Sequence, residues 1–494
     1  MSKGPFEQCS KVTLQEVLDF RDDRKRRQDA LFARFCPSAG TRAAGKAFAH
    51  ATLVSLSLNI PGEYKHFSWA LRSFREEMDF FSRLLRSEGI VVLHEERIEE
   101  KCGYTGLMVA GETGERLKRL GTWAEEHHGL GRLFDIDVFN DHGEKISRQD
   151  GGGPGRACLI CGGNPFCCAR GQAHSREELT QAVLSIMGGF FRKSLEEMIR
   201  ETALKALLYE VSVSPKPGLV DRFHNGAHGD MDFFSFINSA TAIVPFFADC
   251  AVAGFDYRAK ADDDDGGLAT VPALFESLRQ GGRIAEELMR EASGGVNTHR
   301  GMIFSLGVIS AAYGFLFHDQ ERPPADALFS LCQSMTRNLE ADFAGTGTVL
   351  SHGEAIYCSE GIAGIRGEAS RGFPSVRDYS LPQLARMREG GASFNDAGIV
   401  ILLGLLARID DTNIIYRSDV QTLRAVQRDL LEFMAGNPDP QAVVEKARRL
   451  DREFIQKNIS PGGSADLIGL TFFLHLLLSV QNEPSDPSRT RASF

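Results

Sequence analysis

The chain has 494 residues, of which 43% are apolar and 25% charged, and it carries a formal net charge of −10. Such a composition is typical of a globular protein with roughly two to four domains. The acidic balance, without a dense Lys/Arg block among aromatic residues, argues against a nucleic-acid partner. No signal peptide and no run of about 18 apolar residues is recognisable, and ten cysteines are too few for a disulfide scaffold. We therefore expect a cytoplasmic protein with reduced thiols and no membrane partner.

The first part of the chain mixes helical and extended patterns. Apolar residues at helical spacing predict helices over residues 10–35, 68–87 and 112–128. Alternating or short apolar runs predict strands over residues 51–60, 90–93, 105–110 and 133–139. Glycines predict a turn at 141–143 and a flexible loop at 151–155. This order predicts an α+β domain over residues 8–187 with a small mixed or antiparallel sheet.

A domain boundary is expected near residue 190. Ser175 and Glu178 have the spacing of a capping box, which predicts a helix that runs to about Met187. The two glycines that follow, Gly188 and Gly189, are expected to break this helix. We therefore place a linker over residues 188–197.

The second part of the chain, residues 198–481, is predicted to be an all-α domain. Almost every segment there has helical spacing, and no strand stands out. The acidic run at residues 262–265 is expected to be a solvated insertion, and the polar residues 482–494 a disordered tail. The chain as a whole is thus expected to be a multidomain protein.

Two carboxylates stand in the otherwise apolar run Gly131–Val138. Asp135 and Asp137 are two positions apart, so on a strand both point to one face while the residues between them are buried. A carboxylate pair on a rigid strand can hold Mg²⁺ and thereby bind a triphosphate. The plainer interpretation, two exposed acids on a strand edge, stays open at this point.

A group of cysteines follows some twenty residues later. Cys158, Cys161, Cys168 and His174 are spaced as C-x2-C-x6-C-x5-H, which supplies the ligand types of a zinc site. A structural Zn²⁺ and a set of reduced cysteines lining a loop both fit this spacing. Arginines flank the group, and guanidinium groups match the oxygen geometry of phosphates.

The first part of the chain resembles the apo-citrate lyase phosphoribosyl-dephospho-CoA transferases, the holo-acyl-carrier-protein synthases of citrate lyase. The residues that carry the resemblance follow in order: Arg21–Arg24 with Arg27 and Gln28, Pro61 and Gly62 with Lys65, Gly131–Val138, Ser147 and Arg148, and Cys158 through Arg170 to His174. One departure is the glycine run before Cys158, where the family has a stretch with proline and arginine. If that arginine binds triphosphate, the task falls here to Arg148 or Arg156.

This resemblance implies a nucleotidyltransferase-like domain that attaches a coenzyme-A-derived group to a serine of the citrate lyase acyl carrier protein, the γ subunit, and releases pyrophosphate. Asp135 and Asp137 are then the expected catalytic, Mg²⁺-binding acids. The expected phosphate contacts are Arg24, Lys65, Arg132, Arg148, Arg156 and Arg170.

Five polar, glycine-punctuated motifs separate the helices of the second part, at residues 214–232, 295–301, 352–371, 410–417 and 458–466. Each motif alone can be explained by helix caps and turns, as for Ser464. Together, glycine-rich turns that open helices can present N–H groups to phosphates. The acids that could hold Mg²⁺ are Asp230, Asp232, Asp410 and Asp411. The side chains that could bind the substrate are Lys216, Asn225, His228, Asn297, His299, Arg300, His352, Arg366, Arg417 and Ser464.

Through these five motifs, residues from about 203 to 480 resemble the triphosphoribosyl-dephospho-CoA synthases. The resemblance implies a helical, Mg²⁺-dependent site that takes ATP and 3′-dephospho-CoA, displaces adenine and joins the two riboses. No Walker A sequence is present. Substitution at an anomeric carbon would be helped by a general base. The candidates are Asp221, Asp230 and Glu354, with His228, His299 and His352 as alternatives.

The two resemblances fit one pathway, so we interpret the chain as a bifunctional enzyme that matures citrate lyase. One part would make the prosthetic-group precursor and the other would use it. Two alternatives remain: the equivalent system for malonate decarboxylase, and a non-enzymatic adaptor made of a zinc knuckle and a helical scaffold. The cysteine group and the sequence around Asp135 favour citrate lyase.

Overall fold

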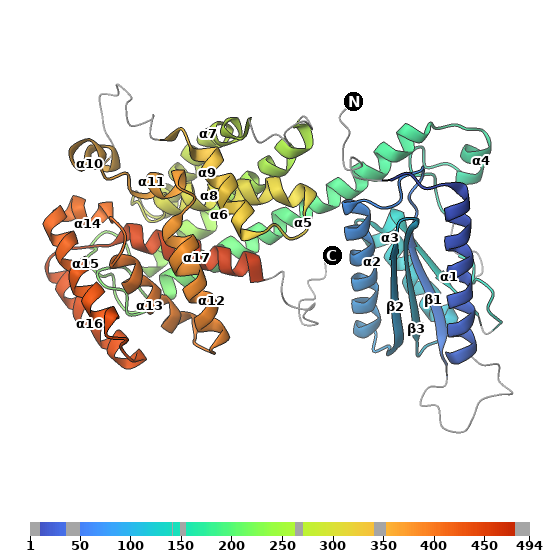
Figure 1. The fold of residues 1–494 in the computed structure, drawn as a ribbon, viewed down its shortest axis with the longest axis horizontal. Coiled ribbons are helices and arrows are strands. Elements are labelled where there is room, and N and C mark those ends of the chain that lie inside the picture. Colours follow the sequence, from blue (N-terminus) through green and yellow to red (C-terminus); the bar gives the residue numbers. More distant parts are fainter. Residues whose placement is uncertain are drawn as a thin grey trace. The chain divides into compact units, whose positions relative to one another are not determined.

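The chain forms two compact units that divide between Lys193 and Ser194, called here the N-terminal and C-terminal units. Figure 1 shows the computed structural model, which describes residues 10–35, 50–140, 142–148, 155–261, 270–339 and 352–479. Three expected features lie outside the described residues: most of the glycine loop at 151–155, the acidic run at 262–265, and the tail at 482–494.

The N-terminal unit is built on an antiparallel sheet with the strand order β2-β3-β1-β4. Its strands are β1 (Thr52–Leu58), β2 (Val92–Glu100), β3 (Gly103–Ala110) and β4 (Phe134–Val138). The expected α+β architecture is confirmed, and the sheet is antiparallel rather than mixed. Strand β2 extends well beyond the predicted residue 93, because its second half is so rich in charged side chains that the alternation is hidden.

Helices cover both faces of this sheet (Figure 1). Helix α1 (Leu14–Phe35) lies on one face, where Leu31 packs with Leu53, Leu107 and Val109 of the sheet. Helices α2 (Ser68–Ser87) and α3 (Gly114–His127) lie on the other. There, glycines allow close approach: a Cβ on Gly106 of β3 would overlap Met78 of α2, and one on Gly121 of α3 would meet Ile136 of β4.

Helix α5 (Arg176–Ser212) crosses the division between the two units. It begins with the predicted capping box, in which the Ser175 Oγ and the Glu178 carboxylate each accept from the other's backbone N–H. The expected helix break at Gly188 and Gly189 is wrong, since both lie inside α5. A helical glycine costs only about 1 kcal/mol relative to alanine, and here Gly188 allows the ring of Trp69 to pack close to the helix backbone.

Every regular element assigned to the described residues of the C-terminal unit is helical, which confirms the all-α prediction. These elements are α6 (Phe233–Lys260), α7 (Val271–Ala292), α8 (Arg300–Asp319), α9 (Ala325–Thr336), α10 (His352–Glu360), α11 (Gly364–Ser370), the π-helical segment η6 (Ser375–Ser380), α12 (Leu381–Glu389), α13 (Phe394–Leu406), α14 (Thr412–Arg417), α15 (Val420–Ala435), α16 (Pro440–Gln456) and α17 (Gly462–Ser479). Helices α6 and α8 pack backbone to backbone, because a Cβ on Gly254 or Gly314 would overlap a carbonyl oxygen of the facing helix.

Three helices in the described residues, α6, α8 and α17, are long and apolar enough to cross a membrane by length and composition. In this fold α8 buries 83% of its most apolar window, α17 buries 61% and α6 buries 44%. The core of the C-terminal unit therefore accounts for most of the apolar window of α8 and α17, and for less than half of that of α6.

Candidate functional site

Strand β4 presents Asp135 and Asp137 as its alternation predicts. Both face the same side of the sheet, opposite Ser57 and Ser55 of β1, while the residues between them are buried. Each acid is partly exposed and ion-paired: Asp135 lies 3.1 Å from the Arg156 guanidinium, and Asp137 is paired with Lys145. The two carboxylates are thus fixed in direction and neutralised by cations that a ligand can reach.

Charged side chains also form hydrogen bonds with the backbone groups along the free edge of β4. The Ile136 N–H donates to Glu125 over 2.8 Å, and its carbonyl accepts from Lys118 over 3.1 Å. Arg156 donates to the Phe134 carbonyl over 2.7 Å. Burial lowers the pKa of Lys118. An edge strand must cover its backbone groups, and here the covering groups are the charges that surround the acid pair.

Glu125 is the centre of this arrangement, although the sequence analysis did not select it. Its buried carboxylate binds the guanidinium groups of both Arg148 and Arg156, the latter over 2.5 Å. Burial, and then the charge of Arg156, lower the pKa of Arg148. Helical spacing from the buried Leu117 and Gly121 would have placed Glu125 on the covered face of α3.

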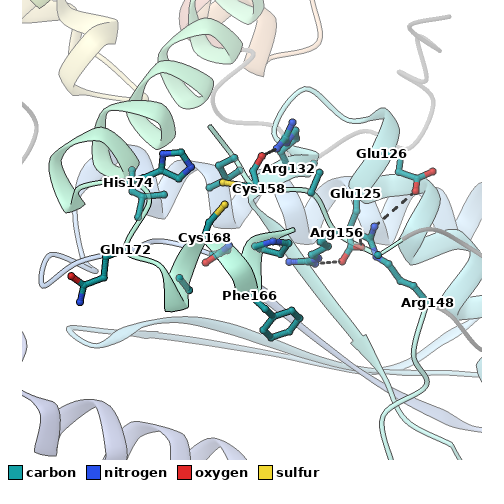
Figure 2. Close-up of a pocket in the computed structure, with 18 residues that line it drawn as sticks. Glu125, Glu126, Arg132, Arg148, Arg156, Cys158, Phe166, Cys168, Gln172 and His174 are labelled. Carbon is teal, nitrogen blue, oxygen red and sulfur yellow. Dashed lines mark hydrogen bonds and ion pairs between the residues drawn. The ribbon is translucent and has the colours of Figure 1, made fainter. Parts of the chain in front are cut away.

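A cavity of about 750 Å³ opens beside these side chains (Figure 2). Three of the predicted phosphate ligands line it, namely Arg132, Arg148 and Arg156. Arg132 donates to the carbonyl of Cys158 over 2.8 Å. The cavity thus gathers three guanidinium groups next to Asp135, and the carboxylates of Glu125 and Glu126 line it as well.

The other predicted phosphate ligands of this unit do not line the cavity. Lys65 donates to the Ile60 carbonyl, and burial lowers its pKa. Arg170 is exposed at the end of the short helix α4 (Pro165–Arg170). Arg24 lies one turn before the buried Gln28, so it is on the side of α1 that faces the sheet.

Glu77 of α2 is a second carboxylate that sequence analysis missed. It is fully buried, and neither carboxylate oxygen has a hydrogen-bond partner among the described residues. Burial, and then the Asp135 charge, raise the pKa of Glu77 well above its usual range. Its position between Phe74, Met78 and Phe81 on the apolar face of α2 was the available signal.

The predicted cysteine and histidine ligands come together in the same region. The Cys158, Cys161 and Cys168 sulfurs and one ring nitrogen of His174 all lie within 4.8 Å of one another. Three of these residues, Cys158, Cys168 and His174, also line the cavity (Figure 2).

In the C-terminal unit, two fully buried charges form a pair: Glu210 at the end of α5 and Lys216 in the loop after it. Their carboxylate and ammonium groups are 2.5 Å apart, and each side chain is 1% exposed. Burial raises the pKa of Glu210, and the Lys216 charge opposes this rise. The predicted phosphate ligand Lys216 is therefore already paired, with a glutamate that the sequence analysis overlooked in an apolar helical run.

Asp221, a predicted general base, organises the loop between α5 and α6. One oxygen accepts from the Ser214 hydroxyl over 2.6 Å, and the other accepts from the Phe223 N–H over 2.8 Å. The N–H groups of Lys216 and His224 also donate to this carboxylate. With both oxygens occupied and the side chain buried, Asp221 suits a structural role better than proton transfer.

Asp411 and Ser464 join the fourth motif to the fifth. The Asp411 carboxylate accepts from the Ser464 N–H and hydroxyl, both over 2.8 Å, and also caps α14. Next to them, Asp466 approaches Gly301 at the start of α8 so closely that a Cβ there would overlap its carboxylate. Burial, and then the charges of Glu210 and Asp411, raise the pKa of Asp466 well above its usual range.

The predicted histidines bridge these motifs. His299 is buried and bonds to the Ser239 hydroxyl over 2.7 Å; burial lowers its pKa to about 3. His228 lies 2.8 Å from the Ser460 hydroxyl and 3.2 Å from the Arg417 guanidinium. Burial, and then Arg417, lower the pKa of His228 to about 4. Both imidazoles are therefore neutral at pH 7.

The predicted Mg²⁺ acids of this unit do not form one cluster: no group of three or more acids lies at metal-binding distance in the described part of the chain. Asp232 caps α6, Asp411 caps α14, and Asp410 is paired with Arg424 over 2.5 Å. Asp230 is 63% exposed beside His228. The spacing of caps and turns explains these acids as well as metal binding does.

The remaining predicted residues lie around the same region or at its surface. Glu354 and Arg366 of the third motif form an ion pair of 3.2 Å. Asn297 caps the N–H of Arg300, which is exposed and paired with Glu286. Asn225 is exposed, and the side chain of His352 lies outside the described residues.

The five motifs nevertheless converge. A Cβ on Gly364 of the third motif would lie 3.0 Å from Thr412 of the fourth, and the bonds of Asp411 and His228 connect the first, fourth and fifth motifs. The second motif joins them at Gly301, beneath Asp466. Segments far apart in sequence thus build one polar, partly buried site around Glu210 and Lys216.

Comparison with known proteins matches this division of the chain. The model of the ATP:dephospho-CoA triphosphoribosyl transferases (CitG) matches residues 196–485, and that of the apo-citrate lyase phosphoribosyl-dephospho-CoA transferases (CitX) matches residues 12–189. The chain is 30% identical to Protein CitXG of Leuconostoc mesenteroides subsp. cremoris over 96% of its own length and 99% of that relative.

Two further relatives are similar to this chain, one over nearly its whole length and one over its C-terminal part. Protein CitXG of Haemophilus influenzae is 29% identical, with 94% of this chain and 96% of the relative covered. A probable 2-(5''-triphosphoribosyl)-3'-dephosphocoenzyme-A synthase of Streptococcus equi is 37% identical over 58% of this chain and 98% of its own length.

Fold, sites and comparisons define a two-part transferase with a separate domain for each reaction. The chain belongs to the CitXG family of bifunctional citrate lyase maturation proteins. Both resemblances found in the sequence are confirmed, and the chain is an enzyme with a triphosphoribosyl-dephospho-CoA synthase domain and a phosphoribosyl-dephospho-CoA transferase domain.

Proposed function

We propose that the C-terminal unit makes 2′-(5″-triphosphoribosyl)-3′-dephospho-CoA from ATP and 3′-dephospho-CoA and releases adenine. The N-terminal unit then transfers the phosphoribosyl-dephospho-CoA group to a serine of the citrate lyase acyl carrier protein, the γ subunit, and releases pyrophosphate. The observation that supports this most directly is the convergence of Arg132, Arg148 and Arg156 on one cavity beside Asp135. Three guanidinium groups in one concave site suit a polyphosphate chain.

In the N-terminal reaction, the carrier serine hydroxyl attacks the phosphorus nearest the ribose, and the bond to pyrophosphate breaks. The cavity arginines would neutralise the charge that develops on the leaving group. Asp135 and Asp137 fit a Mg²⁺ ion, because both are partly exposed on one face of a rigid strand. The ion would supply further positive charge at the phosphates. This pairing of acids with a phosphate-binding cavity is what supports a nucleotidyltransferase-like domain.

In the C-terminal reaction, the 2′-hydroxyl of dephospho-CoA attacks the anomeric carbon of ATP, and the bond to adenine breaks. We favour Asp466 as the group that accepts the hydroxyl proton. Its side chain lies against Gly301 at the start of α8, and burial together with the Glu210 and Asp411 charges raises its pKa, which makes the carboxylate a stronger base. The starts of α8 and α17 meet at this residue and could direct backbone N–H groups toward phosphates.

Mg²⁺ would enter this unit with ATP, since it binds through substrate phosphates and one or two carboxylates rather than through an all-protein cage. Asp230 suits this purpose, because its side chain is 63% exposed. Both substrates are metabolites of the cell interior and the described cysteines are free thiols, so we infer a cytoplasmic enzyme.

The test uses the full chain with ATP, dephospho-CoA and Mg²⁺. We expect adenine to appear, and the apo-carrier of citrate lyase to gain the mass of the prosthetic group when it is added. The apo-carrier of malonate decarboxylase serves as the comparison. Absence of adenine would overturn the assignment of the C-terminal unit, and a mass gain on the malonate carrier alone would overturn the choice of partner.

A further inference from the structure

Four side chains at residues 158–174 form a cluster that no step of the two reactions uses. The Cys158, Cys161 and Cys168 sulfurs and a His174 ring nitrogen lie within 4.8 Å of one another. Figure 2 shows Cys158, Cys168 and His174. A tetrahedral zinc site, with Zn–S bonds of about 2.3 Å, holds its sulfur ligands roughly 3.8 Å apart. The Cys161 and Cys168 sulfurs are 3.5 Å apart. The four atoms are thus gathered closely enough for one zinc ion to bind them with small shifts of the side chains.

The backbone around the first two cysteines is folded as a tight turn. The Cys158 N–H donates to the Gly163 carbonyl over 2.7 Å, and the Gly162 N–H donates back to the Cys158 carbonyl over 3.2 Å. Gly162 has a φ of +71°, which glycine adopts without strain. This turn holds Cys158 and Cys161 close together, as the cluster requires.

The third and fourth ligands come from the next elements of the chain. Asn164 caps the start of α4, which carries Cys168. The Nε2 atom of His174 is buried and has no hydrogen-bond partner in the described part of the chain. The neighbouring Cys167 is exposed and is not a member of the cluster.

We propose that Cys158, Cys161, Cys168 and His174 bind one structural zinc ion. Four protein ligands leave no open position for a substrate, so the ion holds the chain rather than acting on the reaction. The segment it closes begins next to Arg156 and contains the Cys158 carbonyl that accepts from Arg132. Zinc therefore positions two cavity arginines, a consequence that rests on the phosphate-binding role proposed for the N-terminal unit.

The test measures metal before activity. The full chain is produced with zinc in the medium, and zinc is counted by mass spectrometry and by release to a chromogenic chelator. We expect one zinc per chain, loss of that zinc in Cys161→Ser and His174→Ala, and full retention in the matched control Cys167→Ser. A wild-type chain without zinc would overturn the proposal, as would equal loss in Cys167→Ser.

A second measurement, on the wild-type chain, tests the proposal even if a variant fails to fold. Co²⁺ added to the metal-free wild-type chain should give the visible bands of a tetrahedral site and a thiolate charge-transfer band. A Cys161–Cys168 disulfide in the freshly purified chain, without bound metal, would instead show a redox pair and overturn the proposal. Zinc removal should weaken carrier modification about tenfold or more while adenine release stays unchanged. Because zinc is counted directly, failure of the transfer function would not be mistaken for failure of the site.

Discussion

One ion pair from each candidate site shows two opposite settings for charged groups. In the N-terminal unit, the paired side chains of Asp135 and Arg156 are 43% and 32% exposed. In the C-terminal unit, those of Glu210 and Lys216 are 1% exposed. Exposed pairs contribute little to stability and exchange partners readily, whereas a buried pair is costly to break.

Because of this difference, substitutions at the first pair should affect activity and substitutions at the second should affect folding. Substrate can replace the ion-pair partners at the edge of β4, so a substitution there should change activity and leave the fold intact. The Glu210–Lys216 pair must form as the C-terminal unit folds, so a substitution there should lower stability first. The predictions below test this contrast, beginning with the largest expected effect.

Lys216→Ala should be the most damaging of these substitutions. It leaves the Glu210 carboxylate buried without its partner, a change that costs about 3–5 kcal/mol in other proteins. We expect unfolding of the C-terminal unit at much lower urea concentration and loss of adenine release. The matched control is Lys205→Ala, which breaks the half-exposed pair with Glu201 on α5 and should cost at most about 0.5 kcal/mol. Equal costs for the two variants would refute the buried-pair argument.

Asp135→Asn should lower the rate of carrier modification by a factor of about 10² or more. Stabilisation of phosphoryl transfer by a metal ion and by charge is worth several kcal/mol. Adenine release and the unfolding midpoint should stay unchanged, because Asp135 is partly exposed. Both activities are measured on one preparation. Glu99→Gln is the control, an acid on the opposite edge strand that is also paired with an arginine. If Asp135→Asn abolished both activities in a folded chain, the two sites would not be independent.

The sequence predicted what depends on local periodicity. The common face of Asp135 and Asp137 follows from the two-residue period of a strand, and α2 has the predicted bounds of residues 68–87 because its apolar stripe is unbroken. The motif residues were also recognisable, since glycines and capping groups mark turns at any depth in the fold. These features need no knowledge of distant partners.

What the sequence did not show depends on which charged side chains the fold buries and pairs. Glu125 and Glu210 were overlooked because a lone acid in a helix is normally exposed, and their partners, Arg148 and Lys216, become neighbours only in the fold. Asp221, in contrast, was selected as a candidate base, but its acceptor bonds satisfy the groups of its own loop. Acids at the buried positions of an amphipathic helix are the signal to look for.

The pH dependence of stability should also differ between the sites. Burial lowers the pKa of His228 to about 4 from an ordinary value of 6.5, so the unfolded chain takes up a proton that the folded chain does not. The stability of the C-terminal unit should therefore fall as the pH drops from about 6.5 to about 4. This histidine contributes at most about 1.4 kcal/mol of that loss for each pH unit. Urea titrations compare wild type with His228→Gln, which should lack this part of the loss. His142→Gln, in an exposed loop of the N-terminal unit, should follow wild type.

The smallest effect concerns the glycine pair that the sequence suggested as a linker. Gly189 is exposed inside α5 with no neighbour near its missing Cβ, so Gly189→Ala should stabilise the N-terminal unit by about 0.5–1 kcal/mol. Gly188→Ala should raise the free energy of unfolding less, because its Cβ would lie 3.0 Å from the Trp69 ring. Gly189→Pro should lower the free energy of unfolding by about 3 kcal/mol or more, because it interrupts the helix. Urea unfolding of the three variants measures this order. A flexible linker would instead tolerate proline and gain nothing from alanine, so the series decides whether the chain between the two sites is helix or hinge.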